Sequence, residues 1–163
     1  MLFAIDQFEE IVRNFFVIMI GKDPIADLRL APDKWTLKEM VGHLLDSASN
    51  NHQRFVRLQL TDLLTFPAYQ AEEWRAVGKV QGLEYRFLVN LWKDYNSLLL
   101  HIVSQISPDS LDHCWESPTG PIRLADLVID YYAHLQRHED LFRERVAEIA
   151  AQNASSKEEL KTR

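Results

Sequence analysis

The chain has 163 residues, of which 47% are hydrophobic and 26% are charged, and its formal net charge is −6. This length suits one domain with a buried core, while the acidic balance argues against nucleic-acid binding, which needs a surplus of Lys and Arg to neutralise phosphates. The sole cysteine, Cys114, cannot form an internal disulfide and no apolar run is long enough to cross a membrane, so we expect a cytoplasmic protein without a membrane partner.

The first two helices are predicted from apolar residues at helical spacing. Over residues 6–20, apolar side chains recur every three or four positions, and Gly21 and Pro24 end the pattern. Thr36 and Glu39 have the spacing of a capping box, in which each side chain satisfies a free backbone N–H at the start of a helix. The apolar stripe that follows predicts a second helix to about residue 60.

Residues 61–80 form a connection that contains Pro67 and Gly78. It is long for a compact domain, and such connections often cover functional sites. The same apolar spacing predicts a third helix over 83–106 and a fourth over 124–150. Between them lies the turn sequence SPTGP, and a short strand or 3₁₀ element is an alternative near 111–123.

Four amphipathic helices joined by two longer connections predict an all-α fold, a four-helix bundle. We expect the bundle to occupy residues 1–150, with a long loop between its second and third helices. Residues 151–163 are polar, and we expect them to form a flexible C-terminal tail.

Two histidines, His134 and His138, lie four residues apart on the predicted fourth helix, on the face that carries Leu127, Tyr131 and Leu141. Both rings are therefore expected to point into the bundle. Two neutral imidazoles one turn apart can bind one divalent ion. The alternative is a pair of core histidines that are hydrogen-bonded within a polar layer.

A polar stripe runs beside the apolar stripe of the second helix and begins at His43, which adjoins Met40 and Leu44. In a bundle, His43 can face the histidine pair of another helix, and three imidazoles leave a metal with an open coordination position. The alternative is that the stripe faces water, Asn50 and Arg54 included. His52, His101 and His113 are less suited to this site, because they lie on other faces or in a loop.

Acidic and basic residues near these histidines suggest further roles. Asp46 or Asp130 would orient a ligand imidazole or act as a base, with Asp130 alternatively a fourth ligand or a solvated acid. Arg54 would hold an anionic group of a substrate, together with Asn51 on the same stripe.

Three segments resemble the DinB-like (YfiT-like) superfamily of metal-dependent enzymes: WTLKEMVGHLLDSASNNHQRFVRLQL, EYRFLVNLWKDYNSLLLHIVSQISPDSL and LADLVIDYYAHLQRHEDLF. The resemblance implies a four-helix bundle, a homodimer and a divalent metal, zinc or nickel, held by three histidines. The metal ligands of the family fall on His43, His134 and His138. Relatives of this kind include transferases and isomerases that use low-molecular-weight thiols, so a thiol is a second expected cofactor.

Three hypotheses follow. The first is a metal-dependent enzyme for a small molecule, either a hydrolase or a thiol S-transferase, in which water or thiolate takes the open position. The second is a non-catalytic stress-response module that binds a metal or small ligand, with a fourth protein ligand such as Asp130. The third is a structural layer of hydrogen-bonded histidines without a metal.

Overall fold

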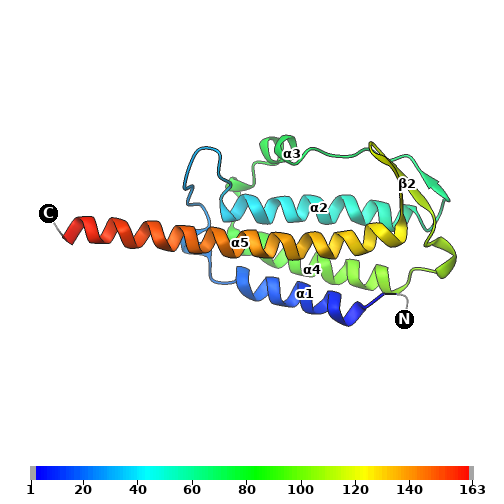
Figure 1. Ribbon diagram of the computed structural model, residues 1–163, viewed down its shortest axis with the longest axis horizontal. Coiled ribbons are helices and arrows are strands. Elements are labelled where there is room, and N and C mark those ends of the chain that lie inside the picture. The colour runs from blue at the N-terminus through cyan, green and yellow to red at the C-terminus, as the bar shows by residue number, and fades with distance from the viewer. Residues whose placement is uncertain (1–2, 162–163) are drawn as a thin grey trace.

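Four long helices form the body of the molecule, in a computed structural model that describes residues 3–161, with side chains described through residue 155. They are α1 (Ile5–Met19), α2 (Leu37–Arg57), α4 (Tyr85–Ser104) and α5 (Leu124–Lys161). α1 and α2 each pack against both α4 and α5. Figure 1 shows the four helices side by side, with α2 and α4 running in the same direction. The predicted four-helix bundle is confirmed.

The predicted start of α2 is correct. The Thr36 hydroxyl accepts a hydrogen bond from the Glu39 backbone N–H at 3.1 Å, and the Glu39 carboxylate accepts one from the Thr36 backbone N–H at 2.8 Å. The apolar stripe behind this capping box is buried in the core. Leu37, Val41, Leu44, Ala48 and Phe55 are its fully buried members. Burial of this stripe against α4 and α5 fixes which side of α2 faces the core.

The fold is mostly helical rather than strictly all-α, because three short strands lie at one end of the bundle. β1 (Leu63–Leu64) pairs in parallel with β2 (Cys114–Ser117), which pairs antiparallel with β3 (Gly120–Arg123). The predicted turn joins β2 to β3, and Gly120 there adopts a φ of 120° that favours glycine. The strands are too short to leave a readable alternation in the sequence, but the alternative of a strand near 111–123 is correct.

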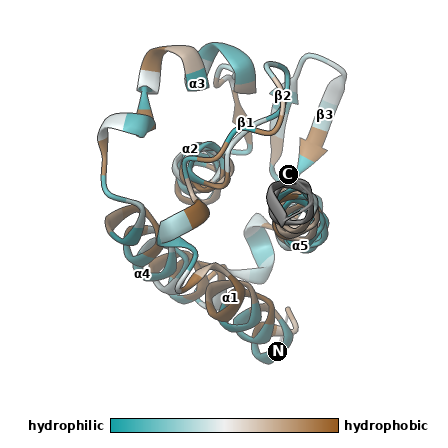
Figure 2. Cartoon of the chain, turned by 90° about the vertical axis from the view of Figure 1, so that its left-hand side faces the viewer, coloured by the Kyte–Doolittle hydropathy of each residue, from teal (hydrophilic) through white to brown (hydrophobic). Residues whose placement is uncertain are grey.

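The connection between α2 and α4 is also more ordered than the predicted long loop. It contains β1, the short helix α3 (Ala71–Gly78) and a 3₁₀ turn over Val80–Gly82. Two further 3₁₀ turns span Asp23–Ile25 and Pro108–Ser110. Viewed along the bundle in Figure 2, α2 lies between α4, α5 and the segment that carries α3. α2 is therefore covered on the side that the bundle leaves open.

The last helix is longer than expected. α5 was predicted to end near residue 150, but it continues to Lys161 and extends beyond the other helices in Figure 1. Residues 151–161 are rich in Ala, Glu and Lys, which have high helix propensity. The expected flexibility of residues 151–163 stays a prediction, and residues 162 and 163 lie outside the described residues.

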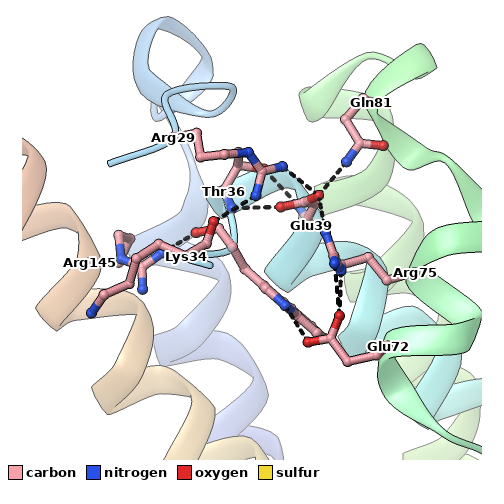
Figure 3. A network of polar contacts seen from close by, with 9 residues as sticks. Arg29, Lys34, Thr36, Glu39, Glu72, Arg75, Gln81 and Arg145 are labelled. Atoms are coloured by element: carbon pink, nitrogen blue, oxygen red, sulfur yellow. Dashed lines mark hydrogen bonds and ion pairs between the residues drawn. The ribbon is translucent and has the colours of Figure 1, made fainter. Parts of the chain in front are cut away.

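A buried carboxylate fastens the α2–α4 connection to the start of α2 (Figure 3). The Glu39 side chain accepts hydrogen bonds from Arg29 at 2.7 Å, from Arg75 of α3 at 2.9 Å and from Gln81. Nearby, the backbone of Gly42 lies against Val80, since a Cβ at Gly42 would stand 3.0 Å from the Val80 methyl groups. Polar and steric contacts thus hold the connection directly over the first turns of α2.

Within the described part of the chain, no helix combines the length and the apolar character that a membrane span requires.

Candidate metal centre

Three histidine side chains meet between α2 and α5. The ring of His43 on α2 lies 5.5 Å from that of His134 and 4.8 Å from that of His138, and the two α5 rings are 4.3 Å apart, all between centroids. Each ring offers one nitrogen such that the three atoms lie within 4.8 Å of one another. Among the described residues, these three are the His, Cys, Asp or Glu side chains that lie close enough together to hold a metal ion.

The local sequence explains why these rings converge. His134 and His138 are one turn apart and flank Leu135, while Tyr131 lies one turn before Leu135, and both Tyr131 and Leu135 are buried. On α2, His43 comes directly before the fully buried Leu44. All three histidines are half-buried at the edge of the core, where α2 packs against α5. The packing of two apolar stripes therefore brings together three nitrogen-bearing side chains.

The polar atoms of this cluster fit a metal ion better than a hydrogen-bonded layer. The Nδ1 atoms of His43, His134 and His138 are buried, and none has a hydrogen-bond partner among the described residues. Buried polar atoms without partners are rare in folded proteins. Imidazole nitrogen is a preferred ligand of zinc and nickel. A structural layer of mutually bonded histidines would instead satisfy these atoms.

The surroundings keep the three rings neutral. Burial lowers the pKa of His43, and burial together with the charges of His43 and Arg137 lowers the pKa of His134 to about 4. Burial and the neighbouring histidines lower the pKa of His138 to about 3. Neutral imidazoles have free lone pairs, which metal binding requires. Near neutral pH the cluster is therefore ready to bind a cation without first losing protons.

Aromatic side chains from two loops enclose the cluster. The Trp35 ring is 5.5 Å from the His43 ring, and the Tyr69 ring is 6.4 Å from it. Trp74 of α3 packs on Tyr69 at 5.0 Å. The expectation that the long connection covers a functional site agrees with this arrangement. Tyr69 could not be predicted from the sequence, because no nearby residue marks which side of the connection faces α2.

A cleft of about 360 Å³ opens beside the cluster, between α5 and the segment before α2. Its walls include His138, the apolar side chains of Trp35 and Leu141, and charged groups of both signs, namely the cations Lys34 and Arg145 and three carboxylates. This volume is in the range of small-molecule sites. A small molecule therefore has a route to the side of the cluster that His138 occupies.

The two candidate catalytic acids lie in different surroundings. Asp46, one turn after His43, is half-buried, and burial raises the pKa of its carboxyl to about 6. Asp130 is exposed and pairs with Arg137 at 3.4 Å, outside the three-histidine group. Its charge acts to raise the pKa of His134, against the larger effect of burial. Of the two acids, Asp46 alone is sheltered from water.

The candidate substrate-binding residues lie further along α2. Asn50 and Arg54 are both buried, so the alternative that the polar stripe faces water is wrong for them. Asn51 is half-buried, and its amide nitrogen donates to the Ser47 carbonyl at 2.9 Å. The polar stripe is covered by the connection and the sheet rather than by solvent.

The remaining histidines lie outside the three-histidine group. His52 is within hydrogen-bond distance, 3.0 Å, of the Tyr95 hydroxyl, and His113 is 2.5 Å from the Leu58 carbonyl oxygen and 3.2 Å from the Asp62 carboxylate. His101 is exposed on α4. The prediction that these three lie away from the cluster is correct.

The fold and the site together define a helical bundle with three histidines gathered between two of its helices. No protein-family model matches the chain. It is 26% identical over 106 residues to a protein of Oceanobacillus iheyensis named "Putative metal-dependent hydrolase", and the match covers 64% of this chain and 60% of that protein. The chain therefore spans less than two thirds of the length of this relative.

Two solved structures share the fold. YfiT from Bacillus subtilis, described as a probable metal-dependent hydrolase with an unusual four-helix bundle topology, matches with a TM-score of 0.76 and 15% identity over 90% of this chain and 87% of YfiT. A mycothiol-dependent maleylpyruvate isomerase matches with a TM-score of 0.63 and 14% identity over 84% of this chain and 60% of the isomerase. The resemblance to the DinB-like (YfiT-like) superfamily is thus confirmed at the level of the fold.

Proposed function

We propose that this protein is a divalent-metal-dependent enzyme that acts on a small molecule, either as a hydrolase or as an S-transferase for a low-molecular-weight thiol. The observation that carries the proposal is the set of three buried Nδ1 atoms without partners, on neutral rings that converge from α2 and α5. The names of the relatives, a metal-dependent hydrolase and a mycothiol-dependent isomerase, support both halves of it.

His43, His134 and His138 would hold the ion, zinc or nickel, through three imidazole nitrogens. When bound, such an ion supplies a Lewis acid with a free position, where water or a thiol loses its proton more readily. Trp35 and Tyr69 pack around His43, which is half-buried, and would reduce the access of water to that side of the cluster. The cleft beside His138 admits the substrate.

Asp46 would accept and return the proton that the reaction releases. Its carboxyl has a pKa raised to about 6 by burial, which suits proton exchange near neutral pH. Asp130 would act on His134 through its charge alone, since its carboxylate is exposed and paired with Arg137. The homodimer expected from the family resemblance stays a prediction.

The proposed function is tested by turnover with and without metal. We expect protein reconstituted with zinc or nickel to hydrolyse activated esters, or to transfer a low-molecular-weight thiol such as mycothiol to an electrophile, and a chelator to abolish that activity reversibly. Rates are measured by absorbance, and bound metal by elemental analysis. A protein with stoichiometric metal and no turnover of either kind contradicts the enzymatic proposal and favours a binding module.

The pH dependence of the rate tests Asp46. Because a base acts only when deprotonated, the rate should fall about tenfold per pH unit below a pH of about 6. Burial raises the pKa of Tyr69 on the connection, and the charge of Asp46 acts in the same direction. We expect Asp46→Asn to lose this acid limb and Asp130→Asn to keep it. An acid limb that survives in Asp46→Asn at constant metal content excludes Asp46 as the base.

A further inference from the structure

Among the residues whose side chains the structure describes, Arg54 is the buried charged one that lacks a counter-ion. Lys38, Glu39 and Arg54 are the charged side chains that are buried among the described residues. Lys38 pairs with Asp27 at 2.7 Å, and Glu39 pairs with two arginines. Arg54, only 6% exposed, makes no ion pair with any described residue. Its guanidinium donates to the Asn51 amide oxygen at 3.4 Å, which is a long contact. A buried cation without a counter-ion is costly.

The guanidinium of Arg54 is held in a defined place. Its Cζ lies 3.9 Å from the centroid of the Trp115 ring, and its Nε is buried without a hydrogen-bond partner. Trp115 on β2 is itself fixed, because its Nε1 donates to the Phe66 carbonyl at 2.7 Å. Burial lowers the pKa of Arg54, although the group stays charged at any ordinary pH. The fold therefore positions a cation with unused donors.

A row of polar side chains joins this cation to the histidine cluster. His43, Ser47 and Arg54 lie at helical spacing along one face of α2, about 16 Å apart from first to last along the axis. The Arg54 side chain leans back toward the start of the helix, which shortens this span. Tyr69 lies beside the middle of the row: burial and the charge of Asp46 raise its pKa, while a hydrogen bond with Ser47 and the charge of Arg54 act to lower it.

We propose that Arg54 binds a carboxylate group of the small molecule whose reacting end lies at the three histidines, an inference that rests on the proposed metal-dependent function. A carboxylate matches the fork of guanidinium N–H donors and provides the missing counter-ion. The substrate class is then an elongated molecule with an anionic end at Arg54 and an electrophilic or thiol end at the cluster. Trp115 and Asn51 hold the guanidinium in place for it.

The anion site is tested without any metal. The side-chain Nε–H resonance of Arg54 is followed by nitrogen-15 NMR during titration with butyrate. A parallel titration with butanol serves as the uncharged control. We expect butyrate alone to shift the resonance. The resonance is assigned by its loss in Arg54→Lys, while Arg57→Lys, which alters an exposed arginine one turn later that donates to Gln53, should leave it and its shift unchanged. No shift with butyrate, or an equal shift with butanol, overturns the proposal.

The distance between the histidine cluster and Arg54 is tested with cobalt-loaded protein. The ligands are thiols of increasing length that end in either a carboxylate or a hydroxyl. Thiol binding is measured by thiolate-to-cobalt absorption. Beyond a certain length, we expect the carboxylates to bind at least about tenfold more tightly than the matched alcohols. Arg54→Met should remove that advantage and leave alcohol binding unchanged, whereas Arg57→Met keeps it. An advantage that persists in Arg54→Met contradicts the inference.

The butyrate titration and the thiol-binding series together distinguish a failure of this inference from a failure of the proposed function. Absence of any thiol-to-cobalt absorption contradicts the metal-dependent function, yet the butyrate titration still decides whether Arg54 binds a carboxylate. Thermal melting of the four arginine variants checks that each is folded. A folded Arg54→Met protein that binds alcohol-ended thiols normally therefore isolates the contribution of the cation.

Discussion

Replacing His138 by alanine is expected to lower the affinity for zinc or nickel by more than about 100-fold and to remove metal-dependent activity. Loss of groups that merely orient a ligand already costs about 10- to 100-fold in metal affinity, so loss of one of three ligands should cost more. The ring of His138 is the closest of the cluster to both others, at 4.3 Å and 4.8 Å between centroids. Its removal leaves two nitrogens on different helices.

Elemental analysis of purified protein and calorimetric titration with zinc measure this effect. The matched control is His52→Ala, because His52 is also a half-buried histidine on a bundle helix but bonds to Tyr95. We expect full metal content in the control and almost none in His138→Ala. Equal metal content in the two variants contradicts the assignment of the site.

Thermal stability gives an independent measurement. An ion that binds only the folded state stabilises it by about 2.7 kcal/mol at a concentration 100 times its dissociation constant. Zinc should therefore raise the melting temperature of the natural chain and of His52→Ala, but not that of His138→Ala. A rise of the same size in all three proteins would place the ion elsewhere.

The sequence was sufficient to predict those parts of the structure that a local residue pattern determines. The Thr36 and Glu39 capping box sets the start of α2, and apolar spacing sets the faces of the four helices. Because helical spacing also fixes which residues share a face, His134 and His138 could be placed together, and His43 could be placed beside the core stripe.

The sequence was insufficient where the structure depends on contacts between distant segments. Tyr69 reaches the cluster because Glu39 fastens α3 over α2, and no periodic pattern encodes that contact. Arg54 was expected either to face water or to bind a substrate, and only the position of Trp115 on a short strand shows that it is buried. Charged residues in a polar stripe are ordinarily solvated, so their burial requires the tertiary structure to be known.

Replacing Glu39 by alanine is expected to destabilise the protein by about 2–4 kcal/mol, since it breaks a buried charge network and removes a helix cap. The Glu39 side chain is 0% exposed, and its partners Arg29 and Arg75 are 34% and 29% exposed. Because these arginines can be partly hydrated when Glu39 is removed, the loss of stability should lie near the lower end of the range for a broken buried ion pair. Urea unfolding monitored by circular dichroism measures the change.

The matched comparison is Glu72→Ala. Glu72 also accepts a hydrogen bond from Arg75, and another from Trp35 at 2.8 Å, but it is exposed, so its removal should matter little. Glu39→Ala should also expose the α2–α4 connection to proteolysis, because Arg75 and Gln81 lose their common acceptor. Similar losses of stability in the two variants would contradict the distinct role of the buried carboxylate.

The effect of Glu39 should depend on pH in a defined direction. Burial acts to raise the pKa of this carboxyl, but hydrogen bonds from Arg29, the Thr36 backbone and Arg75 outweigh it and leave the pKa lowered. A group with a lowered pKa in the folded state stabilises the protein above its unfolded pKa, about 4.5 here, and loses that contribution as the pH falls through the folded value. The stability difference between the natural chain and Glu39→Gln should therefore be constant near neutral pH and shrink below a pH of about 4.5. A difference that instead grew as the pH fell would mean that the carboxyl is protonated in the folded protein, and that burial rather than the arginines sets its charge.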